Sequence, residues 1–407
     1  MTALSDRNDD AADPRAARGL RRIINVSGTM TALGASIVVP EAIAAVAGVL
    51  PHFVEIGDLQ RKASTTIARL CSTEAGFVTA SAAAGLSITV AGAMTGADLA
   101  AIERLPDTRG LKNEVVIQTG HMVGYGAPVD QAIRLTGAKV VPVGQATEVR
   151  PYQLEGAIGP ATAAVMFVVS HHVVQYGQLT LKEVVEIARP HSVPVIVDGA
   201  SEYDLKTFLA YGADAAIYSG HKFLGGPTAG IVAGKLELVR ASFLQNMGIG
   251  RGMKVGKEGM LGTIAALEAW ETRDHAGIRA RETGYLQFWH DRLSRHPGVT
   301  SEIEPDPTDN PLDRLKVRVD PTLSRVSAWD LADALARGDR PVIVRDHEVE
   351  NGYFYLDPCN LHMGEETIVA DRLDEELAYA RTTNFPAPTL IAERRRRRFE
   401  AALRWPN

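Results

Sequence analysis

Short apolar segments alternate with alanine-rich, amphipathic segments between about residues 75 and 240. The apolar segments are rich in β-branched residues and are predicted to be strands, at 76–80, 114–118, 139–144, 162–170, 193–198, 215–220 and 229–234. Most segments between them carry apolar residues at spacings of three and four, which is typical of helices. This alternation predicts an α/β fold with a mostly parallel central sheet and helices on both faces.

The pattern changes after about residue 255. A long helical region is predicted over 257–297, then a strand at 312–320, a further helix, and short strands at 341–347 and 352–357. These elements predict a smaller α+β domain joined by a linking helix. We expect a mobile tail at 1–20, an N-terminal segment at 21–50 that contributes to the small domain and the active site, a large domain at 51–260, and the linking helix with the small C-terminal domain at 261–407.

The composition is that of a soluble globular protein. The chain has 407 residues, a hydrophobic content of 45% and a net charge of −6 at pH 7. This charge predicts no nucleic-acid partner, and the apolar runs are too short to cross a membrane. Cys71 and Cys359 lack CxxC spacing and predict neither a disulfide framework nor a zinc site, so we expect a reducing cytoplasm.

Both chain ends are polar. The first eighteen residues have no apolar stretch like that of a secretory signal. Near the other end, five consecutive arginines, Arg394 to Arg398, form a basic run that could contact RNA or an acidic partner. Because the rest of the chain is acidic, we interpret this run as the solvated face of a terminal helix.

Polar residues stand at the predicted ends of three strands. Ser170, Asp198 and Ser219 each close an apolar run, and Lys222 follows in the stretch YSGHKFLGGPTAG. In a parallel α/β sheet, ligands bind beyond the carboxyl ends of the strands. Asp198 and Lys222 are one βαβ step apart, so we expect both at the same edge of the sheet.

A lysine beside a carboxylate at such an edge suits pyridoxal phosphate. The amine condenses with the cofactor's aldehyde, and the carboxylate keeps the pyridine nitrogen protonated. The small-residue stretch at 79–85 offers backbone N–H donors for a phosphate at a helix start. Each feature has an ordinary alternative: Lys222 as a surface turn residue, Asp198 as a helix N-cap, and 79–85 as a closely packed helix start. The three features in this chain order favour the cofactor site.

The residues carry a resemblance that runs from about 21 to 375. It rests on INVSGTMTALGAS, ASAAAG, QTGHMVGYGAPVDQAIRLTGAKVVPVG, SHHVVQYGQLTLKEVVEIA, VPVIVDGASEYDL, YSGHKFLGGPTAGIVAGK, GIGRGMKVGKEGMLGTIAALEAW and LDPCNLHMGEETIVADRL. The chain resembles the fold-type I pyridoxal-phosphate enzymes of the selenocysteine synthase-like group, nearest to the D-glucosaminate-6-phosphate ammonia-lyase relatives. The resemblance implies the PLP-dependent transferase fold.

The resemblance also implies roles for individual residues. Lys222 would be the Schiff-base lysine, Asp198 would face the pyridine nitrogen, and Ser219 would hold the phosphate together with the turn Ser81, Ala82, Ala83. The group is commonly oligomeric, which implies a homodimer or higher homo-oligomer with shared active sites. Thr228 would then contact the phosphate across a subunit interface.

Other polar residues are weaker candidates. His121 stands where such enzymes stack a residue on the cofactor ring, and a buried core histidine is the alternative. His171 and His172 are adjacent, so at most one, taken as His172, is expected to contact the cofactor, together with Ser170. Ser27, Thr29 and Arg251 are candidate substrate contacts; for Arg251, as for Lys254 and Lys257, a solvated basic face is the alternative. Histidine spacing predicts no catalytic metal.

Several reactions fit this site. With Lys222 as acid or base, a proton leaves Cα of an amino acid, and the resemblance favours loss of a Cβ substituent from a 2-amino-3-hydroxy acid such as an amino sugar acid. A racemase, aldolase or oxidase on the same scaffold is the alternative. Selenocysteine synthase is disfavoured, because only about twenty residues precede INVSGT and the net charge is negative.

Overall fold

The computed structural model describes residues 13–382 and 388–406. Residues 1–12, the larger part of the expected tail, lie outside the described residues. The chain divides into two compact units: unit 1 is Met1–Gly34, Asp274–Asp306 and Pro311–Asn407, and unit 2 is Ala35–Arg273 and Pro307–Asn310. The first division therefore falls after Gly34, inside the segment 21–50 that the sequence set apart.

Unit 2 contains a seven-stranded sheet in the order β2-β8-β7-β6-β5-β3-β4. Its strands are β2 (Ala75–Thr79), β3 (Glu114–Gln118), β4 (Lys139–Val143), β5 (Thr162–Val168), β6 (Val195–Asp198), β7 (Ala215–Ser219) and β8 (Gly230–Gly234). All seven match the predicted strands. The neighbours from β4 to β7 pair in parallel, whereas β8 pairs antiparallel with both β7 and β2.

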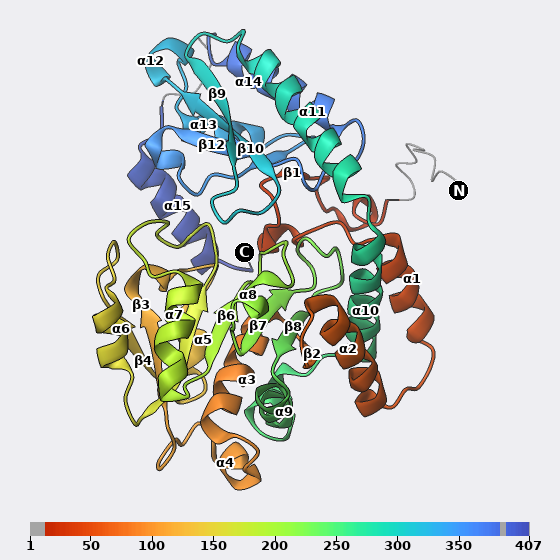
Figure 1. Cartoon of the computed structure of the whole chain (residues 1–407). Helices are drawn as coiled ribbons and strands as arrows, with labels where there is room; N and C mark the ends of the chain where they lie inside the picture. Colours follow the sequence, from red (N-terminus) through yellow and green to blue (C-terminus); the bar gives the residue numbers. More distant parts are fainter. Residues whose placement is uncertain (1–12, 383–387, 407) are drawn as a thin grey trace. The chain divides into compact units, whose positions relative to one another are not determined.

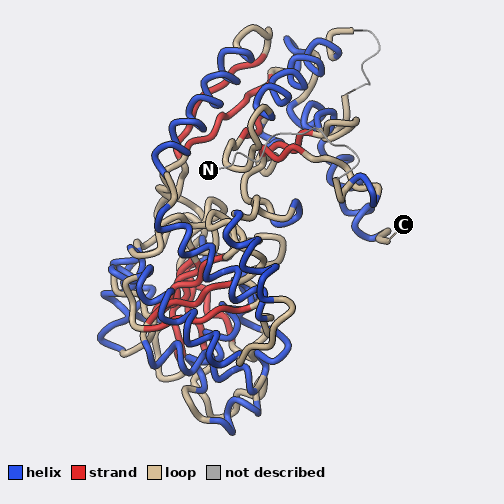
Figure 2. Tube along the Cα trace, turned by 90° about the vertical axis from the view of Figure 1, so that its right-hand side faces the viewer, coloured by secondary structure: helices blue, strands red, loops and turns tan. Residues whose placement is uncertain are grey.

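Helices cover both faces of this sheet, as Figure 2 shows. One face packs against α3 (Ala82–Thr95), α5 (Val129–Arg134) and α9 (Leu236–Leu244). The other packs against α2 (Ile56–Cys71), α6 (Pro151–Ala157), α7 (Leu181–Ala188) and α10 (Lys257–Thr272). Successive strand residues alternate between these two cores, because side chains of a strand point to opposite faces. α1 (Pro40–Val49) packs on α10, and α4 (Leu99–Arg104) follows α3.

Unit 1 is the smaller α+β unit that the sequence predicts. Strands β12 (Tyr353–Leu356), β10 (Asp313–Val319) and β9 (Val299–Pro305) form an antiparallel sheet in that order. The N-terminal strand β1 (Ile24–Val26) pairs in parallel with β11 (Val342–Val344). The helices, labelled in Figure 1, are α11 (His275–Leu293), α12 (Pro321–Ser324), α13 (Ala328–Leu335), α14 (Glu365–Tyr379) and α15 (Ile391–Leu403). Trp289 and Phe354 are fully buried in its core.

The structure differs from the prediction in three elements. The helical region 257–297 is two helices, because Asp274 caps α11 by accepting a hydrogen bond from the Gly277 N–H at 2.9 Å. The segment 201–213, one of the helix-like segments between predicted strands, contains only α8 (Thr207–Ala210), since Asp204 caps a short turn and Gly212 adopts φ +101°. Strand β9, a half-exposed edge strand, was not predicted.

The arginine run lies on α15, and part of it is buried. Arg394 is only 5% exposed and forms ion pairs with Asp333 at 2.8 Å and Asp346 at 2.6 Å. Arg395 pairs with Glu350, and Arg398 also reaches Asp346. The interpretation of a wholly solvated helix is therefore wrong for Arg394, which fastens α15 to other parts of unit 1. Among the described residues, no helix is long and apolar enough to traverse a bilayer.

Candidate active site

The predicted strand-end residues lie at one edge of the sheet in unit 2. Strands β5, β6 and β7 are parallel neighbours, so their carboxyl ends coincide. Beyond the ends, the Val169 N–H donates to the Asp198 carbonyl at 2.9 Å and the Ser219 N–H donates to the Ala200 carbonyl at 3.2 Å. The structure therefore brings Asp198 and Ser219 together, with Ser170 just past the end of β5.

Lys222 lies in the turn that follows β7. Its Nζ donates a hydrogen bond to Ser201 Oγ, in the loop after Asp198. The turn is closed by the Gly226 N–H, which donates to the Gly220 carbonyl at 2.7 Å. Arg273 donates to two successive carbonyls of the turn, those of Phe223 at 2.8 Å and Leu224 at 2.7 Å. These bonds fix the backbone that carries the lysine.

Burial opposes the charges of both central groups. The Asp198 side chain is 7% exposed, and burial raises the pKa of its carboxyl, against a hydrogen bond from the Ala200 N–H and the charge of Lys222. Burial likewise lowers the pKa of the Lys222 amine, although Asp198 and Glu202 counteract it. A lysine with a lowered pKa has more neutral amine at neutral pH, which is the nucleophilic form.

The predicted small-residue cradle is the start of α3. Ser81 is the N-cap, and its Oγ accepts a hydrogen bond from the Ala84 N–H at 3.1 Å. The first N–H groups of a helix have no partner within the helix, and Ala82 and Ala83 stand there without bulky side chains. Gly230 at the start of β8 approaches so closely that a Cβ would lie 2.2 Å from the Ser81 carbonyl oxygen. The close approach explains a glycine at this position.

The histidine candidates have different environments. His121 ends a short 3-10 helix after β3, is 2% exposed, and accepts a hydrogen bond from the Val168 N–H on Nδ1 at 3.1 Å. Burial lowers its pKa to about 4, so the imidazole is neutral at pH 7. The rings of His171 and His172 lie 3.8 Å apart, and the His172 N–H donates to Ser170 Oγ at 3.2 Å. Their contacts with a cofactor stay predictions.

The candidates for binding anionic groups lie on both sides of β8. Arg251 is exposed on a 3-10 helix, Ile249–Met253. Lys257 Nζ instead donates a hydrogen bond to the Leu50 carbonyl at 2.8 Å, near the end of α1. This side chain therefore has a structural contact within unit 2. Thr228 is exposed at the start of the segment that leads into β8. The anion-binding roles of Arg251 and Thr228 stay predictions.

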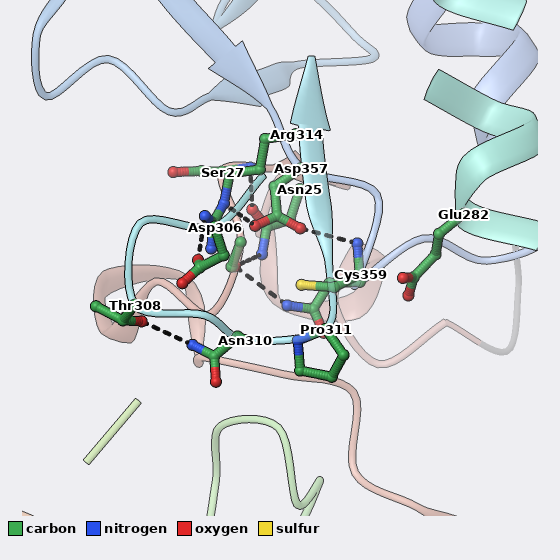
Figure 3. Close-up of polar contacts among 12 residues, drawn as sticks. Asn25, Ser27, Glu282, Asp306, Thr308, Asn310, Pro311, Arg314, Asp357 and Cys359 are labelled. Atoms are coloured by element: carbon green, nitrogen blue, oxygen red, sulfur yellow. Dashed lines mark hydrogen bonds and ion pairs between the residues drawn. The ribbon is translucent and has the colours of Figure 1, made fainter. Parts of the chain in front are cut away.

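The candidates Ser27 and Thr29 belong to unit 1, where a buried polar network holds their loop (Figure 3). The Asn25 side chain accepts from the Ser27 N–H and donates to the Gly28 carbonyl, each at 2.9 Å. Arg314 Nε donates to Asp357 Oδ2 at 2.8 Å, and Arg314 also pairs with Asp306. The loop that carries Ser27 is therefore rigidly anchored inside unit 1.

A second buried arginine of unit 1, Arg345, differs from Arg314 in its ion pairs. Arg345 is 6% exposed, and no ion pair reaches it from the residues that the structure describes. Its Nε has no hydrogen-bond partner there either. Burial and the nearby Arg314 lower its pKa, while Asp357 and Glu348 raise it.

Sequence analysis missed Ser36, Ser201, His221, Arg273 and Arg345 as residues of interest. Ser201 and His221 are neighbours in sequence of recognised motifs, and adjacency to Asp198 and Lys222 was the available signal. Ser36 and Arg273 contact the lysine turn although both are distant from it in sequence, and no local sequence pattern predicts such contacts.

Comparison with known proteins identifies the family of this chain. Residues 23–280 match the family described as SelA, L-seryl-tRNA selenium transferase. The chain belongs to this family. D-glucosaminate-6-phosphate ammonia lyase of Salmonella typhimurium is 39% identical over 362 residues, which cover 89% of this chain and 97% of that protein. The 5'-C-glycyluridine monooxygenase-decarboxylase of a Streptomyces species is 34% identical over 88% of this chain and 90% of that protein.

A solved structure of a similar protein supports the assignment of the fold. The structure of D-glucosaminate-6-phosphate ammonia-lyase matches with a TM-score of 0.82 at 38% identity, over 91% of this chain and 99% of that chain. The family and this match confirm the predicted fold-type I architecture and show that the chain is an enzyme of that class. Membership of the SelA family does not by itself identify the reaction, because the two relatives compared above have names that describe different reactions.

Proposed function

We propose that the protein is a pyridoxal-phosphate-dependent ammonia lyase. The observation that carries the proposal is the buried Asp198 carboxylate, which burial penalises and which lies beside Lys222 at one sheet edge. A buried carboxylate is stabilised by a charged hydrogen-bond donor, and a protonated pyridine nitrogen is such a donor. The residues present therefore fit the cofactor: Lys222 for its aldehyde, Asp198 for its ring nitrogen, and the start of α3 with Ser81 and Ser219 for its phosphate.

Pyridoxal phosphate, when bound, supplies an electron sink for the electrons released at Cα of an amino acid. Lys222 then has the role of general acid and base, since a buried amine with a lowered pKa is able to take a proton near neutral pH. Ser201 holds the Lys222 amine through its Oγ and so keeps the amine aimed at one side of the site. The Arg273 bonds to the lysine turn limit the movement of the backbone below it.

The proposed substrate class is a 2-amino-3-hydroxy acid, of which amino sugar acids are one group. Loss of the Cα proton to Lys222 and departure of the Cβ hydroxyl as water leave an enamine. Protonation at Cβ and hydrolysis then consume one water and release ammonia and a 2-oxo acid, so the net reaction balances. The relative from Salmonella, an ammonia lyase by name, supports this class. Arg251 is the proposed contact for an anionic group of the substrate.

The decisive experiment follows the products of a single mixture. The protein with pyridoxal phosphate is incubated in D2O with a panel of 2-amino-3-hydroxy acids, and ammonia, 2-oxo acid and deuterium positions are measured. We expect ammonia and a 2-oxo acid with deuterium at the former Cβ, and none of these products with Lys222→Ala. Exchange at Cα without any 2-oxo acid would instead identify a racemase, and release of an aldehyde an aldolase.

One alternative has an observation of its own. The relative from Streptomyces is a monooxygenase-decarboxylase by name, so a reaction that uses dioxygen is the second candidate. Oxygen uptake with carbon dioxide release, in the absence of ammonia-lyase products, would favour it. Both candidates require the same cofactor site, so the measurement of oxygen separates them without disturbing the assignment of Lys222 and Asp198.

We also propose that the protein works as a homo-oligomer with shared active sites, in which Thr228 reaches the phosphate held by a neighbouring subunit. Support comes from apolar side chains exposed on α1, on the segment after it and at the start of α2: Ile43, Leu50, Phe53, Val54 and Ile56. Contiguous exposed apolar side chains mark interaction surfaces. α1 is apolar nearly all round, with Glu41 as its charged residue, and such helices are normally covered on every side.

A further inference from the structure

Four acidic or arginine side chains lie in the segment 345–350, directly after β11 in unit 1, and they differ in their contacts. Asp346 and Glu350 form ion pairs with arginines of α15. Arg345 and Glu348 form no ion pair among the residues that the structure describes, either with each other or with another side chain. Arg345 is 6% exposed, and its Nε atom and the Glu348 Oε2 atom are buried there without a hydrogen-bond partner.

The backbone holds both unpaired residues in place. Arg345 and Tyr355, on β12, are joined by two backbone bonds: the Arg345 N–H donates to the Tyr355 carbonyl at 3.0 Å, and the Tyr355 N–H donates back at 2.9 Å. The Glu348 carbonyl accepts the Asn351 N–H at 2.9 Å, at the short 3-10 helix Val349–Asn351. The Tyr355 ring lies 5.8 Å from the Arg345 guanidinium. The segment therefore presents these side chains from a fixed backbone.

The interactions between charges show that Glu348 lies near both of the other side chains. Burial lowers the pKa of Arg345, and the Glu348 charge counteracts it. Burial and Glu304 raise the pKa of the Tyr355 phenol, and the Glu348 charge adds to this effect. One buried donor, one buried acceptor and one aromatic ring thus form a single cluster within unit 1.

The charges around this cluster disfavour an ion as its ligand. An anion attracted by Arg345 would be repelled by Glu348 and Asp357, whose charges both act on Arg345. A cation attracted by Glu348 would be repelled by Arg345. A hydroxyl group is neutral and has one hydrogen to donate and two lone pairs with which to accept. Two hydroxyls of one chain therefore supply both missing hydrogen bonds, which removes the cost of leaving the two buried atoms unpaired.

We propose that Arg345 and Glu348 form a binding site in unit 1 for a polyhydroxylated carbon chain, such as that of a sugar or a sugar acid. The Arg345 Nε–H donates to one hydroxyl, Glu348 Oε2 accepts from another, and the Tyr355 ring gives an apolar surface to the C–H groups of the chain. Two sources supply such a chain: the tail of an amino sugar acid substrate, or a separate sugar. The site itself does not depend on the proposed function, whereas the substrate as the source of the chain rests on it.

Binding of a neutral polyol to the whole protein tests the site. Sorbitol is titrated into the protein, and its binding is followed by saturation-transfer difference NMR. We expect saturable binding to the wild type and at least about tenfold weaker binding to Arg345→Met and to Glu348→Gln, since each variant loses one hydrogen bond to a charged group. Arg340→Met and Glu350→Gln, at exposed positions of the same unit, are the matched controls and should bind sorbitol as the wild type does.

Two outcomes would overturn the proposal. One is the absence of saturable sorbitol binding to the wild type, and the other is equal binding by the wild type, Arg345→Met and Glu348→Gln. Glu348→Gln keeps the shape of the side chain, and its urea unfolding curve shows whether a loss of binding reflects a loss of the fold.

Kinetics identify the source of the chain. In protein loaded with pyridoxal phosphate, Glu348→Gln should raise the KM for D-glucosaminate about tenfold and leave the KM for serine, which has no further hydroxyls, unchanged. Weaker sorbitol binding with both KM values unchanged would assign the site to a separate sugar. A wild-type protein that binds sorbitol but releases ammonia from neither amino acid would defeat the proposed function and leave the site standing.

Discussion

At the scale of single residues, the proposed chemistry depends on the difference between two carboxylates of unit 2, the buried Asp198 and the half-buried Asp214. Among the described residues, no cationic side chain donates a hydrogen bond to Asp198, although the charge of Lys222 lowers its pKa, whereas Asp214 accepts the Val195 N–H at 2.8 Å and pairs with Lys235 at 2.7 Å. Asp214 thus has a cationic partner within the fold, while the proposed function gives Asp198 the cofactor as its cationic partner. Asp214→Asn can therefore serve as the control for Asp198→Asn.

Asp198→Asn should keep the fold but lower the turnover at least about a hundredfold, which corresponds to about 2.7 kcal/mol of lost transition-state stabilisation. The amide cannot hold the pyridine nitrogen in its protonated form. The measurement is kcat for 2-oxo acid release, with the visible absorbance of the bound cofactor as the check on loading. Asp214→Asn should retain most of the activity, and near-normal turnover in Asp198→Asn would leave only a helix-start role for this residue.

His121 makes the stability of the protein depend on pH. Its folded pKa is about 4 and its unfolded pKa about 6.5, so the unfolded chain binds the proton more readily and stability falls as the pH is lowered through this window. Between pH 7 and pH 5 the loss from this group is about 2 kcal/mol.

Urea unfolding at the two pH values measures this loss. His121→Asn, which can accept the Val168 N–H without titrating, should show a smaller pH dependence by about that amount. His52→Asn, at an exposed position of the same unit, is the control. Equal pH dependence in wild type and His121→Asn would contradict the buried, neutral imidazole.

At the scale of elements, two buried arginines of unit 1 have opposite consequences for stability. Arg314, on β10, is paired with Asp306 and Asp357, and Arg345, after β11, has no ion pair among the described residues. Removing one partner of a buried ion pair leaves an uncompensated charge, whereas removing an unmatched buried charge relieves a penalty.

Arg314→Met should therefore lower the free energy of unfolding by about 3–5 kcal/mol. Arg345→Met should cost little or should stabilise the protein, and Arg340→Met, at an exposed position, is the neutral reference. Urea unfolding of the three variants ranks them. A loss for Arg345→Met as large as that for Arg314→Met would mean that the Arg345 charge is already compensated within unit 1.

Local patterns predicted the strands of unit 2 because each is a short β-branched run bounded by turn residues. They did not predict the antiparallel direction of β8, since periodicity along one strand is the same for either direction. Strand β9 was missed because its burial is irregular, and Asp274 was missed as the cap that splits the long helical region.

The candidate site shows the same limit. Asp198, Ser219 and Lys222 were predicted to lie at one sheet edge, because strand ends and chain order place them together. The contacts of Ser36 with His221, and of Arg273 with the lysine turn, join residues 185 and about 50 positions apart. Such contacts depend on how helices pack against the sheet, which no short window of sequence encodes.

At the scale of the whole molecule, the apolar side chains of α1 and the following segment stand out because packing within unit 2 leaves them exposed. Phe53 is 104% exposed and Leu50 is 54% exposed. Leaving such side chains in water costs roughly 1.5–3 kcal/mol each relative to burial, which favours association with another surface. The proposed homo-oligomer would bury them.

Phe53→Asp should therefore lower the molecular mass in solution, measured by light scattering, because a charge would have to be buried at the subunit contact. Tyr152→Asp, at an aromatic residue of α6 that is also largely exposed, at 71%, should leave the mass unchanged. If Thr228 reaches a neighbour's phosphate, the dissociated Phe53→Asp protein should also bind pyridoxal phosphate more weakly, and Thr228→Ala should reproduce that loss without changing the mass. A wild-type protein of monomer mass that still binds the cofactor tightly would contradict both the interface and the shared site.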